Sequence, residues 1–432
     1  MKGLLIGAPN SGSGKTVLTL AMLRALKNTG IHVSPVKAGP DFIDPAFHTL
    51  AAGVQSLNLD AWAMRPELIQ ALAKEHSANN RTLIVEGVMG LYDGAANGVG
   101  SSADLAKMLS LPIILVVDCA RQSHSLAALV LGFKNYRNDV KIKGLILNKV
   151  GSIRHEAMLR QSLESLNIPV LGAIHRNDAF FLAERHLGLV QACEISKIDD
   201  FIENAANIFA QCVDLNALID LSQTVHQVDV QCSTSHIVPL GQHIAVSKDE
   251  AFAFCYQHLL EGWQKSGATI SFFSPLHNEV PDKNADAVYL CGGYPELYAE
   301  QLANAHNFKK AIRNMATEGK IIYGECGGYI TLGEWLEDKN GKKHEMLSLL
   351  PLKTSFSRKK LHLGYRQLTP VSNFIWNKPL RGHEFHYVSI IDEKKAKPLF
   401  HVRDALDNNL GTMGVIQDNV AGSFIHIIDC VM

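Results

Sequence analysis

The chain has 432 residues, of which 47% are hydrophobic, and its 41 Lys and Arg against 42 Asp and Glu give a formal net charge of −1. This length exceeds one ordinary core and predicts two or three domains, while the balanced charge argues against a nucleic-acid partner. The eight cysteines form no C-x-x-C pair, so we expect neither a zinc knuckle nor a disulfide framework. Free cysteines fit a reducing compartment, and we therefore expect a cytoplasmic protein. No apolar run reaches 18 residues, so we expect a soluble protein without a membrane partner.

The first half of the chain alternates short apolar runs with amphipathic segments such as 17–27 and 125–133. The apolar runs are residues 4–6, 31–36, 83–85, 113–117 and 145–147. This rhythm predicts an α/β fold in which helices flank a mostly parallel sheet. Ligands of such sheets bind at the carboxyl ends of the strands.

The first predicted strand leads into APNSGSGKT, a phosphate-binding loop. A Gly/Ser loop that turns into a helix leaves backbone N–H groups free to hold phosphates. Lys15 would reach the terminal phosphates and Thr16 would offer its hydroxyl to Mg²⁺. The loop departs from the usual pattern, because Pro9 occupies the place of the first glycine. The residues predicted to bind ATP here are Ser11, Gly12, Ser13, Gly14, Lys15 and Thr16.

Acidic residues follow the next strands. Asp41 and Asp44 lie in GPDFIDP, a loop made rigid by glycine and proline, and Glu86 ends an apolar run before the glycine-rich loop that carries Asp93. Carboxylates near a phosphate loop can hold Mg²⁺ or orient a substrate. Taken alone, the Asp-Pro and Gly-Pro pairs are equally typical of plain turns. Asn148 ends a later run, LILNKV.

Residues 214–242 show no clear period and are interpreted as a linker. A new alternating pattern begins after it. We therefore divide the chain into residues 1–213, the linker 214–242, and residues 243–432.

The second part contains GECGGYITLG directly after an apolar run. This order predicts a strand, a tight turn and a helix, and such a turn pushes the Cys326 sulfur out at the end of the strand. The positive end of the helix and a nearby His would favour the thiolate, so Cys326 is the candidate nucleophile. A lone cysteine is otherwise a common buried core residue.

Two further segments supply what such a nucleophile needs. CGGYPE follows the apolar run 287–290, and adjacent glycines at a strand end can point backbone N–H groups into an oxyanion hole. His426 lies in the late run AGSFIHIID and is the candidate base, although a core histidine is the default interpretation. The segment RGHEFHY adds His383 and Glu384 as substrate-side candidates. Zinc is not expected there, because H-E-x-x-H requires His where Tyr387 stands.

GGYPE, GECGGY and GSFIH in this order resemble a class I glutamine amidotransferase domain, in particular that of the cobyrinic acid a,c-diamide synthases. The resemblance implies that Cys326 takes the glutamine amide as a thioester and releases ammonia, with His426 raising its nucleophilicity. Gly293 and Gly327 would supply the oxyanion N–H groups. One departure stands out: the usual triad has Glu two residues after the His, where this chain has Ile428, so a Cys–His dyad is expected.

The first half resembles the same family in KAGPDFIDP and EGVMGLYDG, and its phosphate loop is similar to that of dethiobiotin synthetases. Glu86, an acid directly after an apolar strand, occupies the usual place of an Mg²⁺ ligand opposite a phosphate loop, beside Thr16, and the resemblance implies a further ligand at Asp41. It implies substrate contacts at Lys37, Asp44 and Asp93. By analogy with the related ATP-dependent ligases, Asn148 would contact the adenine edge.

The resemblance spans nearly the whole chain and implies a P-loop NTPase-like domain followed by a flavodoxin-like amidotransferase domain. Its expected reaction is ATP- and glutamine-dependent amidation of the a and c acetates of cobyrinic acid, through acyl phosphates, in cobalamin biosynthesis. ATP and Mg²⁺ are the expected cofactors. L-glutamine and a tetrapyrrole polycarboxylate are the expected partners, and a homodimer is left open.

Other substrates and classes remain open on the sequence. Hydrogenobyrinic acid or nickel-sirohydrochlorin are alternative substrates of an a,c-diamide synthase, and a cobyric acid synthase is a more distant alternative. A partitioning-type ATPase switch would share a variant phosphate loop but leaves the second half unexplained. A cysteine hydrolase would work without ATP.

Overall fold

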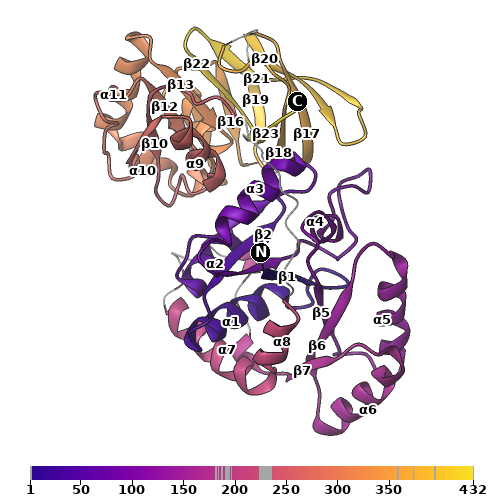
Figure 1. Ribbon diagram of the computed structural model, residues 1–432. Coiled ribbons are helices and arrows are strands. Elements are labelled where there is room, and N and C mark those ends of the chain that lie inside the picture. The colour runs from indigo at the N-terminus through magenta and orange to yellow at the C-terminus, as the bar shows by residue number, and fades with distance from the viewer. Residues whose placement is uncertain are drawn as a thin grey trace. The chain divides into compact units, whose positions relative to one another are not determined.

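The computed structural model describes residues 2–180, 182, 184–185, 188–189, 195, 197–222, 236–357, 360–372, 374–393 and 396–431. The chain forms two compact units, drawn in Figure 1. The first comprises Met1–Trp62 with Pro66–Thr234, and the second Ala63–Arg65 with Ser235–Met432. The predicted linker begins with helix α8 (Leu215–Asp220), whose Leu218 is buried in the first unit. Residues 223–235 of that linker lie outside the described residues.

The first unit contains a seven-stranded parallel sheet in the order β3-β2-β4-β1-β5-β6-β7. Four of the five predicted apolar runs lie within strands of this sheet, and the fifth, residues 31–36, overlaps β2 from residue 33. The strands are β1 (Lys2–Gly7), β2 (Val33–Ala38), β3 (Leu57–Leu59), β4 (Thr82–Glu86), β5 (Ile113–Asp118), β6 (Ile142–Val150) and β7 (Val170–His175). A two-stranded ribbon, β8 (Glu184–Arg185) with β9 (Gly188–Leu189), lies outside it.

Helices connect these parallel strands and surround the sheet (Figure 1). They are α1 (Lys15–Asn28), α2 (Asp44–Ala52), α3 (Pro66–His76), α4 (Ser102–Met108), α5 (Ser125–Tyr136), α6 (Ile153–Leu163) and α7 (Ile198–Cys212), with the short 3₁₀ turns η1 (Glu164–Leu166) and η2 (Asp178–Phe180). Local chemistry fixes some of their ends. Helix α4, for instance, begins at a capping box in which Ser101 and Asp104 satisfy each other's backbone N–H groups.

One face of the sheet forms a core with helices α1, α2 and α7, because alternate strand residues point to the same side. The apolar side chains that meet there include Leu4, Ile6, Leu18, Leu23, Phe47, Ile84, Ile114, Ile146, Ile202 and Phe209, none more than 1% exposed. This burial holds the carboxyl ends of β1, β2, β4 and β6 at one edge of the sheet.

The second unit has a ten-stranded sheet, of which the strands β11-β10-β12-β13-β22 are parallel. Five antiparallel pairings then extend it through β21, β20, β17, β18 and β23. The strands are β10 (His243–Ser247), β11 (Thr269–Phe273), β12 (Ala287–Leu290), β13 (Ile321–Glu325), β17 (His362–Pro370), β18 (Leu380–His386), β20 (Lys397–Asp404), β21 (Asn409–Gln417), β22 (Val420–Ser423) and β23 (Ile425–Cys430). The predicted α/β class with a parallel, helix-flanked sheet is confirmed, and the antiparallel half adds to it.

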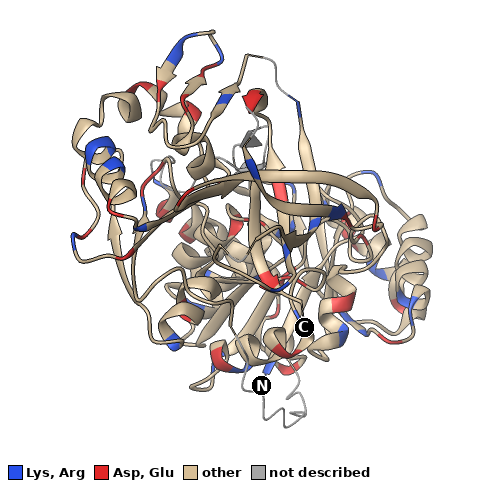
Figure 2. Cartoon of the chain, turned by 90° about the horizontal axis from the view of Figure 1, so that it is seen from above, with Lys and Arg blue, Asp and Glu red and all other residues tan. Residues whose placement is uncertain are grey.

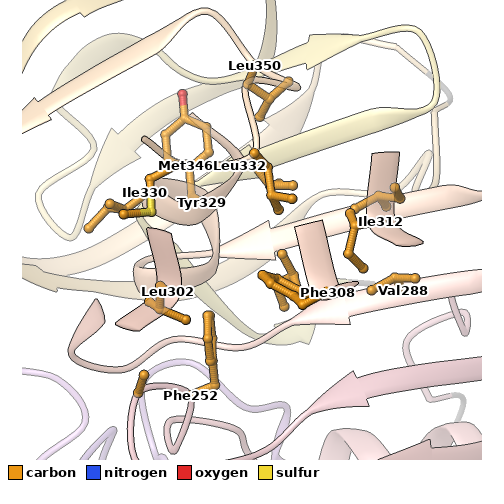
Figure 3. Packing of buried hydrophobic residues seen from close by; sticks show 14 of the residues in the cluster. Phe252, Val288, Leu302, Phe308, Ile312, Tyr329, Ile330, Leu332, Met346 and Leu350 are labelled. Atoms are coloured by element: carbon orange, nitrogen blue, oxygen red, sulfur yellow. The ribbon is translucent and has the colours of Figure 1, made fainter. Parts of the chain in front are cut away.

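The helices of the second unit are α9 (Gln257–Lys265), α10 (Ala299–Asn304), α11 (His306–Thr317) and α12 (Gly327–Leu332), with the 3₁₀ turn η4 (Pro295–Leu297). A small sheet in the order β15-β14-β16-β19 comprises β14 (Trp335–Glu337), β15 (Lys343–Glu345), β16 (Leu352–Ser355) and β19 (Ser389–Glu393). Figure 3 shows apolar side chains meeting between these elements, among them Phe308, Ile312, Tyr329 and Leu332. Tyr329 and Leu332 belong to α12, so the core anchors the helix that follows Cys326.

Acidic and basic residues are interspersed over the elements in the view of Figure 2, in keeping with the net charge of −1. Among the described residues, no helix combines the length and apolar character needed to cross a membrane.

Candidate functional site

The phosphate loop connects β1 to α1 and depends on two glycines. Gly12 and Gly14 have φ values of 79° and 87°, the left-handed region that glycine occupies without strain. A Cβ on Gly14 would also lie 2.4 Å from the Asn148 amide nitrogen. The sequence SGSGKT therefore folds into the tight turn that was predicted before a helix.

Two consecutive residues near the end of β6 donate hydrogen bonds to this loop. Asn148 Nδ2 donates to the Ser13 carbonyl at 2.9 Å, and Lys149 Nζ donates to the Gly12 carbonyl at 3.0 Å. Lys149 also pairs with Asp118 at 2.7 Å. Asn148 is only 6% exposed. The predicted nucleotide residue thus lies directly against the loop, and Lys149, which sequence reasoning missed, joins it.

Lys15 is 8% exposed and donates from Nζ to the Met89 carbonyl at 2.5 Å. Burial lowers the pKa of Lys15, with the charge of Glu86 acting in the opposite direction. Met89 belongs to the predicted loop before Asp93 and has a φ of 49°, which is strained for a residue with a side chain. The exposed Asp93 accepts from Gly90 N at 2.9 Å and so shapes the same loop.

Carboxylates and a lysine gather beside the start of α1. Thr16 Oγ1 donates to Glu86 Oε1 at 2.6 Å. Lys37 Nζ lies 2.8 Å from Glu86 Oε1 and 2.5 Å from Asp44 Oδ2. Glu86 is fully buried, and the Thr16 hydroxyl lies 3.4 Å from Asp44. The structure therefore brings together four residues that the sequence predicted separately.

The charges of this cluster stabilise one another. Burial alone would lower the pKa of Lys37, but Asp44 and Glu86 outweigh it and raise that pKa. Burial alone would raise the pKa of Glu86, but the Lys37 ammonium and the bond from His48 lower it. Burial and the neighbouring Asp41 raise the pKa of Asp44 to about 6. Glu86 is thus the carboxylate held most firmly in its ionised form.

His48 and Asp41 complete the cluster. His48 Nε2 lies 2.5 Å from Glu86 Oε2, and both side chains are fully buried. His48 lies three residues after the motif GPDFIDP, and nothing in its local sequence indicated a partner 38 residues away. Asp41 Oδ1 accepts the backbone N–H groups of Ile43 and Asp44, at 2.7 and 3.1 Å, and so fixes the start of α2.

The donor set suits Mg²⁺. The hydroxyl of Thr16 and the carboxylates of Glu86 and Asp41 are the hard oxygen ligands that this ion prefers. Asp41 keeps its Oδ2 free of hydrogen bonds from the described residues. The residues present are therefore compatible with a magnesium ion beside the phosphate loop.

In the second unit, Cys326 lies between β13 and α12, where the strand–turn–helix was predicted. Its backbone has φ 47° and ψ −106°, an unusual conformation for a residue with a side chain. Its N–H donates to the Ser423 carbonyl at 2.8 Å, and its sulfur, 4.0 Å from the Phe385 carbonyl oxygen, belongs to a side chain that is 6% exposed. The strained turn presents the thiol at the end of the parallel strands.

His426 of β23 lies beside this thiol. Burial alone would lower the pKa of His426, but its hydrogen bond to Cys326 and the charge of Glu325 raise the pKa to about 10. A Cβ on Gly292 would lie 2.2 Å from His426 Cε1, so only glycine leaves room for the ring. The Cys and the His that lie 100 positions apart are thus brought together.

The two predicted oxyanion glycines also meet. A Cβ placed on Gly327 would lie 3.0 Å from the backbone nitrogen of Gly293. A Cβ on Gly293 would lie 2.0 Å from the Ala251 carbonyl oxygen, which restricts this position to glycine. Both backbones therefore lie close to each other next to Cys326.

Two acidic residues have partners that the sequence did not indicate. Glu325, immediately before Cys326, has its Oε2 at 3.5 Å from His426 Nδ1. Asp429, which follows His426 in β23, instead accepts from Arg65 Nε at 2.9 Å and Arg65 Nη2 at 3.0 Å. Arg65 is one of the three residues of 63–65 that belong to the second unit.

A further polar cluster lies on β17 and β18. His362, Glu384 and His386 place ligand atoms within 4.8 Å of one another, a spacing that a metal could bridge. Arg366, however, binds Glu384 Oε2 through Nε and Nη2 at 2.8 and 2.7 Å. The guanidinium neutralises the charge of this carboxylate.

The fold and the two sites define a nucleotide-binding unit joined to a glutamine amidotransferase unit. Residues 4–190 match the family described as the CobQ/CobB/MinD/ParA nucleotide binding domain, and residues 243–429 match the CobB/CobQ-like glutamine amidotransferase domain.

Near-full-length relatives give the particular family. The chain is 56% identical over 430 residues to the hydrogenobyrinate a,c-diamide synthase of Brucella abortus and 54% identical over 429 residues to that of Rhizobium meliloti, with 99% of each chain covered. It is 43% identical to the Agrobacterium fabrum enzyme of the same name, covering 99% of this chain and 98% of that one. The chain belongs to the a,c-diamide synthase family and is a glutamine-dependent amidoligase of cobalamin biosynthesis.

Proposed function

We propose that this enzyme amidates the a and c acetate carboxylates of hydrogenobyrinate, with ATP and glutamine as co-substrates. The observation that carries the proposal is the 56% identity over 99% of the chain with synthases of that name. The sequence alone favoured cobyrinic acid, the cobalt-containing counterpart, which remains the alternative substrate together with nickel-sirohydrochlorin.

The amidotransferase unit would release ammonia from glutamine. The Cys326 thiolate attacks the side-chain amide carbon, and the backbone N–H groups of Gly293 and Gly327 stabilise the oxyanion that forms. His426 holds the proton that leaves with ammonia. Water then cleaves the thioester and glutamate departs. The contact between Cys326 and His426 and the close approach of the two glycines support these roles.

The nucleotide-binding unit would activate the acetate. A carboxylate is a poor electrophile, so its oxygen first attacks the γ-phosphorus of ATP and forms an acyl phosphate as ADP leaves. Ammonia then attacks the acyl carbon, and inorganic phosphate is released with the amide. The phosphate loop from Ser11 to Thr16 holds the phosphates, and Lys15 contacts the terminal ones.

Several side chains would position this step. Magnesium, when bound, supplies charge neutralisation on the transferring phosphoryl group, and Thr16, Asp41 and Glu86 would hold it, with Asp44 close by. Lys37 and Asp44 face the reacting acyl group, and Asp93 contacts the substrate from its loop. Asn148, anchored on Ser13, contacts the adenine edge.

The test offers hydrogenobyrinate, cobyrinate and nickel-sirohydrochlorin in parallel to the purified enzyme with Mg-ATP and glutamine. Mass spectrometry counts the amides added, and ADP and glutamate release are measured beside it. We expect two amides on hydrogenobyrinate with matching ADP. Two amides on another macrocycle would reassign the substrate, and ATP turnover without amide on any of them would overturn the proposal.

The matched variant is Cys326→Ala. It should lose amidation with glutamine and keep amidation with ammonium chloride, because the nucleotide-binding unit is unchanged. Retained glutamine-dependent amidation in this variant would remove Cys326 from the mechanism.

A further inference from the structure

Among the described residues of β23, no carboxylate contacts the His426 ring. Ile428, two residues after His426, is apolar and 1% exposed. Asp429 points its carboxylate to Arg65, which occupies both oxygens. A carboxylate that orients the His426 ring must therefore come from another strand.

Glu325 of β13 fills this place. Its Oε2 lies 3.5 Å from His426 Nδ1, and the two side chains are 3% and 2% exposed. The Tyr289 hydroxyl donates to the same Oε2 at 2.7 Å, and the backbone N–H of Ile427 donates to Oε1 at 3.2 Å. Both carboxylate oxygens are thus held, one of them by the residue next to His426.

The electrostatics agree with this geometry. A buried carboxylate is costly unless a cation or several donors compensate it. In the part of the chain that the structure describes, His426 is the basic side chain that pairs with Glu325. Both side chains are buried, and a charge–charge contact between buried groups is stronger than one in water.

We propose that Glu325 is the positioning residue of the Cys326–His426 pair, so that the residue before the nucleophile supplies the carboxylate missing after the histidine. Glu325 holds Nδ1 of His426, fixes the ring, and stabilises the imidazolium that stands opposite the thiolate. This leaves Nε2 for the proton exchanged with the sulfur and with the leaving ammonia. The inference rests on the proposed glutaminase role of Cys326 and His426.

The test is Glu325→Gln in the full-length enzyme. Glutamine keeps the shape and can still accept from Tyr289, but it loses the charge. We expect kcat for glutamine hydrolysis to fall by about 100-fold, at the low end for groups that act on a proton transfer. The KM for glutamine and amidation with ammonium chloride should stay near wild type.

A second readout is the pH profile of kcat/KM for glutamine hydrolysis. The titratable groups that face the pair are Cys326, Glu325 itself, His383 of β18, Tyr289 of β12, Cys291 directly after β12, and Tyr323 of β13. Removing the Glu325 charge makes the imidazolium a stronger acid, so the alkaline limb should move to lower pH. A merely structural loss would lower the profile without moving that limb.

Two more variants separate the explanations. Tyr289→Phe removes the hydrogen bond to Glu325 but keeps the Glu325 charge. It should lower kcat for glutamine hydrolysis far less than Glu325→Gln does. Glu393→Gln removes the acceptor of the Tyr329 hydroxyl, a second tyrosine–carboxylate pair in the same unit at 2.5 Å, and should leave hydrolysis unchanged.

The outcomes discriminate between the two proposals. Suppose that Cys326→Ala abolishes glutamine hydrolysis while Glu325→Gln keeps the wild-type kcat and the wild-type alkaline limb of the pH profile. The positioning role of Glu325 is then overturned, and the glutaminase assignment of Cys326 survives. If Cys326→Ala is active, the glutaminase assignment itself fails. A reduced kcat with a shifted limb and an unchanged KM supports Glu325.

Discussion

The hydroxyl of Thr16, the second residue of α1, donates to Glu86, the last residue of β4, across 2.6 Å. This bond joins the phosphate loop to the acidic cluster, although 70 residues separate the partners. Glu86 is held in turn by Lys37 and His48, so its carboxylate has one defined orientation. A cation bound by the Thr16 hydroxyl would therefore lie next to a carboxylate that is already correctly oriented.

Glu86→Gln should therefore lose ATP-dependent amidation by about 100-fold or more, the cost typical of a lost electrostatic contact to the transition state. Glutamine hydrolysis belongs to the other unit and should persist. The measurement is ADP release with ammonium chloride as nitrogen source over a range of Mg²⁺ concentrations. Glu164→Gln, an exposed carboxylate of η1, is the control that should behave as wild type. Equal amidation by both variants would contradict the proposed role of Glu86.

Removal of the metal gives an independent prediction. Excess EDTA should stop ADP release and amide formation, because the phosphoryl transfer needs the charge that magnesium supplies. The glutamine hydrolysis proposed for Cys326 uses no such ion and should continue, as measured by glutamate release. Added Mg²⁺ should restore amidation. An EDTA-resistant amidation would show that the Thr16 and Glu86 oxygens serve another purpose.

Gly292→Ala should impair the amidotransferase site without unfolding the unit. The added methyl group would lie 2.2 Å from His426 Cε1, so the ring must move away from Cys326. We expect glutamine hydrolysis to fall by about 100-fold, comparable to the loss of a proton-transfer group. Ammonia-dependent amidation and the thermal midpoint measure whether the fold is kept. Normal hydrolysis in this variant would argue against His426 as the proton carrier.

The local patterns of the chain were sufficient to predict much of the fold. The apolar runs at 4–6 and 113–117, with SGSGKT between strand and helix, follow from periodicity and turn chemistry that a short window contains. Cys326 was found for the same reason, since a glycine-flanked cysteine after a strand marks a tight turn. These features depend on neighbouring residues alone.

Features that depend on distant pairing could not be predicted. The antiparallel half of the ten-stranded sheet is set by pairings such as β18 with β23, and Glu325 became informative only once β13 lay beside the segment that carries His426. Glu325 stood in the quoted motif GECGGYITLG, and His48 lies three residues after GPDFIDP. A buried charge has no local signature, because its partner lies far along the chain.

Gly132→Ala should stabilise the first unit. Gly132 lies inside α5, is exposed, and has no atom within 4 Å of the place where a Cβ would stand. Glycine in a helix interior costs about 0.5–1 kcal/mol relative to alanine, since it loses more conformational freedom on folding. We expect a gain of that size in the free energy of unfolding, measured by urea titration, with unchanged activity. A loss of stability would show that α5 needs glycine for a contact.

Glu384 should make the second unit sensitive to acid. Burial alone would raise the pKa of Glu384, but its bonds to His386 and Arg366 lower the pKa below the usual 4.5. A depressed pKa means that the contribution to stability is complete above pH 4.5 and is lost as the pH falls below it.

Glu384→Gln leaves the buried Arg366 without its counter-charge, which should cost about 3 kcal/mol of the free energy of unfolding at pH 7. At a pH below the depressed pKa of Glu384 the variant and the wild type should converge, because only there is the folded wild-type carboxyl protonated as well. Tryptophan fluorescence during urea unfolding follows this unit, which contains Trp263, Trp335 and Trp376. Glu345→Gln, which removes a largely exposed partner of Arg313, is the control and should change little at either pH. A difference between Glu384→Gln and wild type that stays the same at both pH values would mean that the loss comes from altered side-chain contacts and not from the charge.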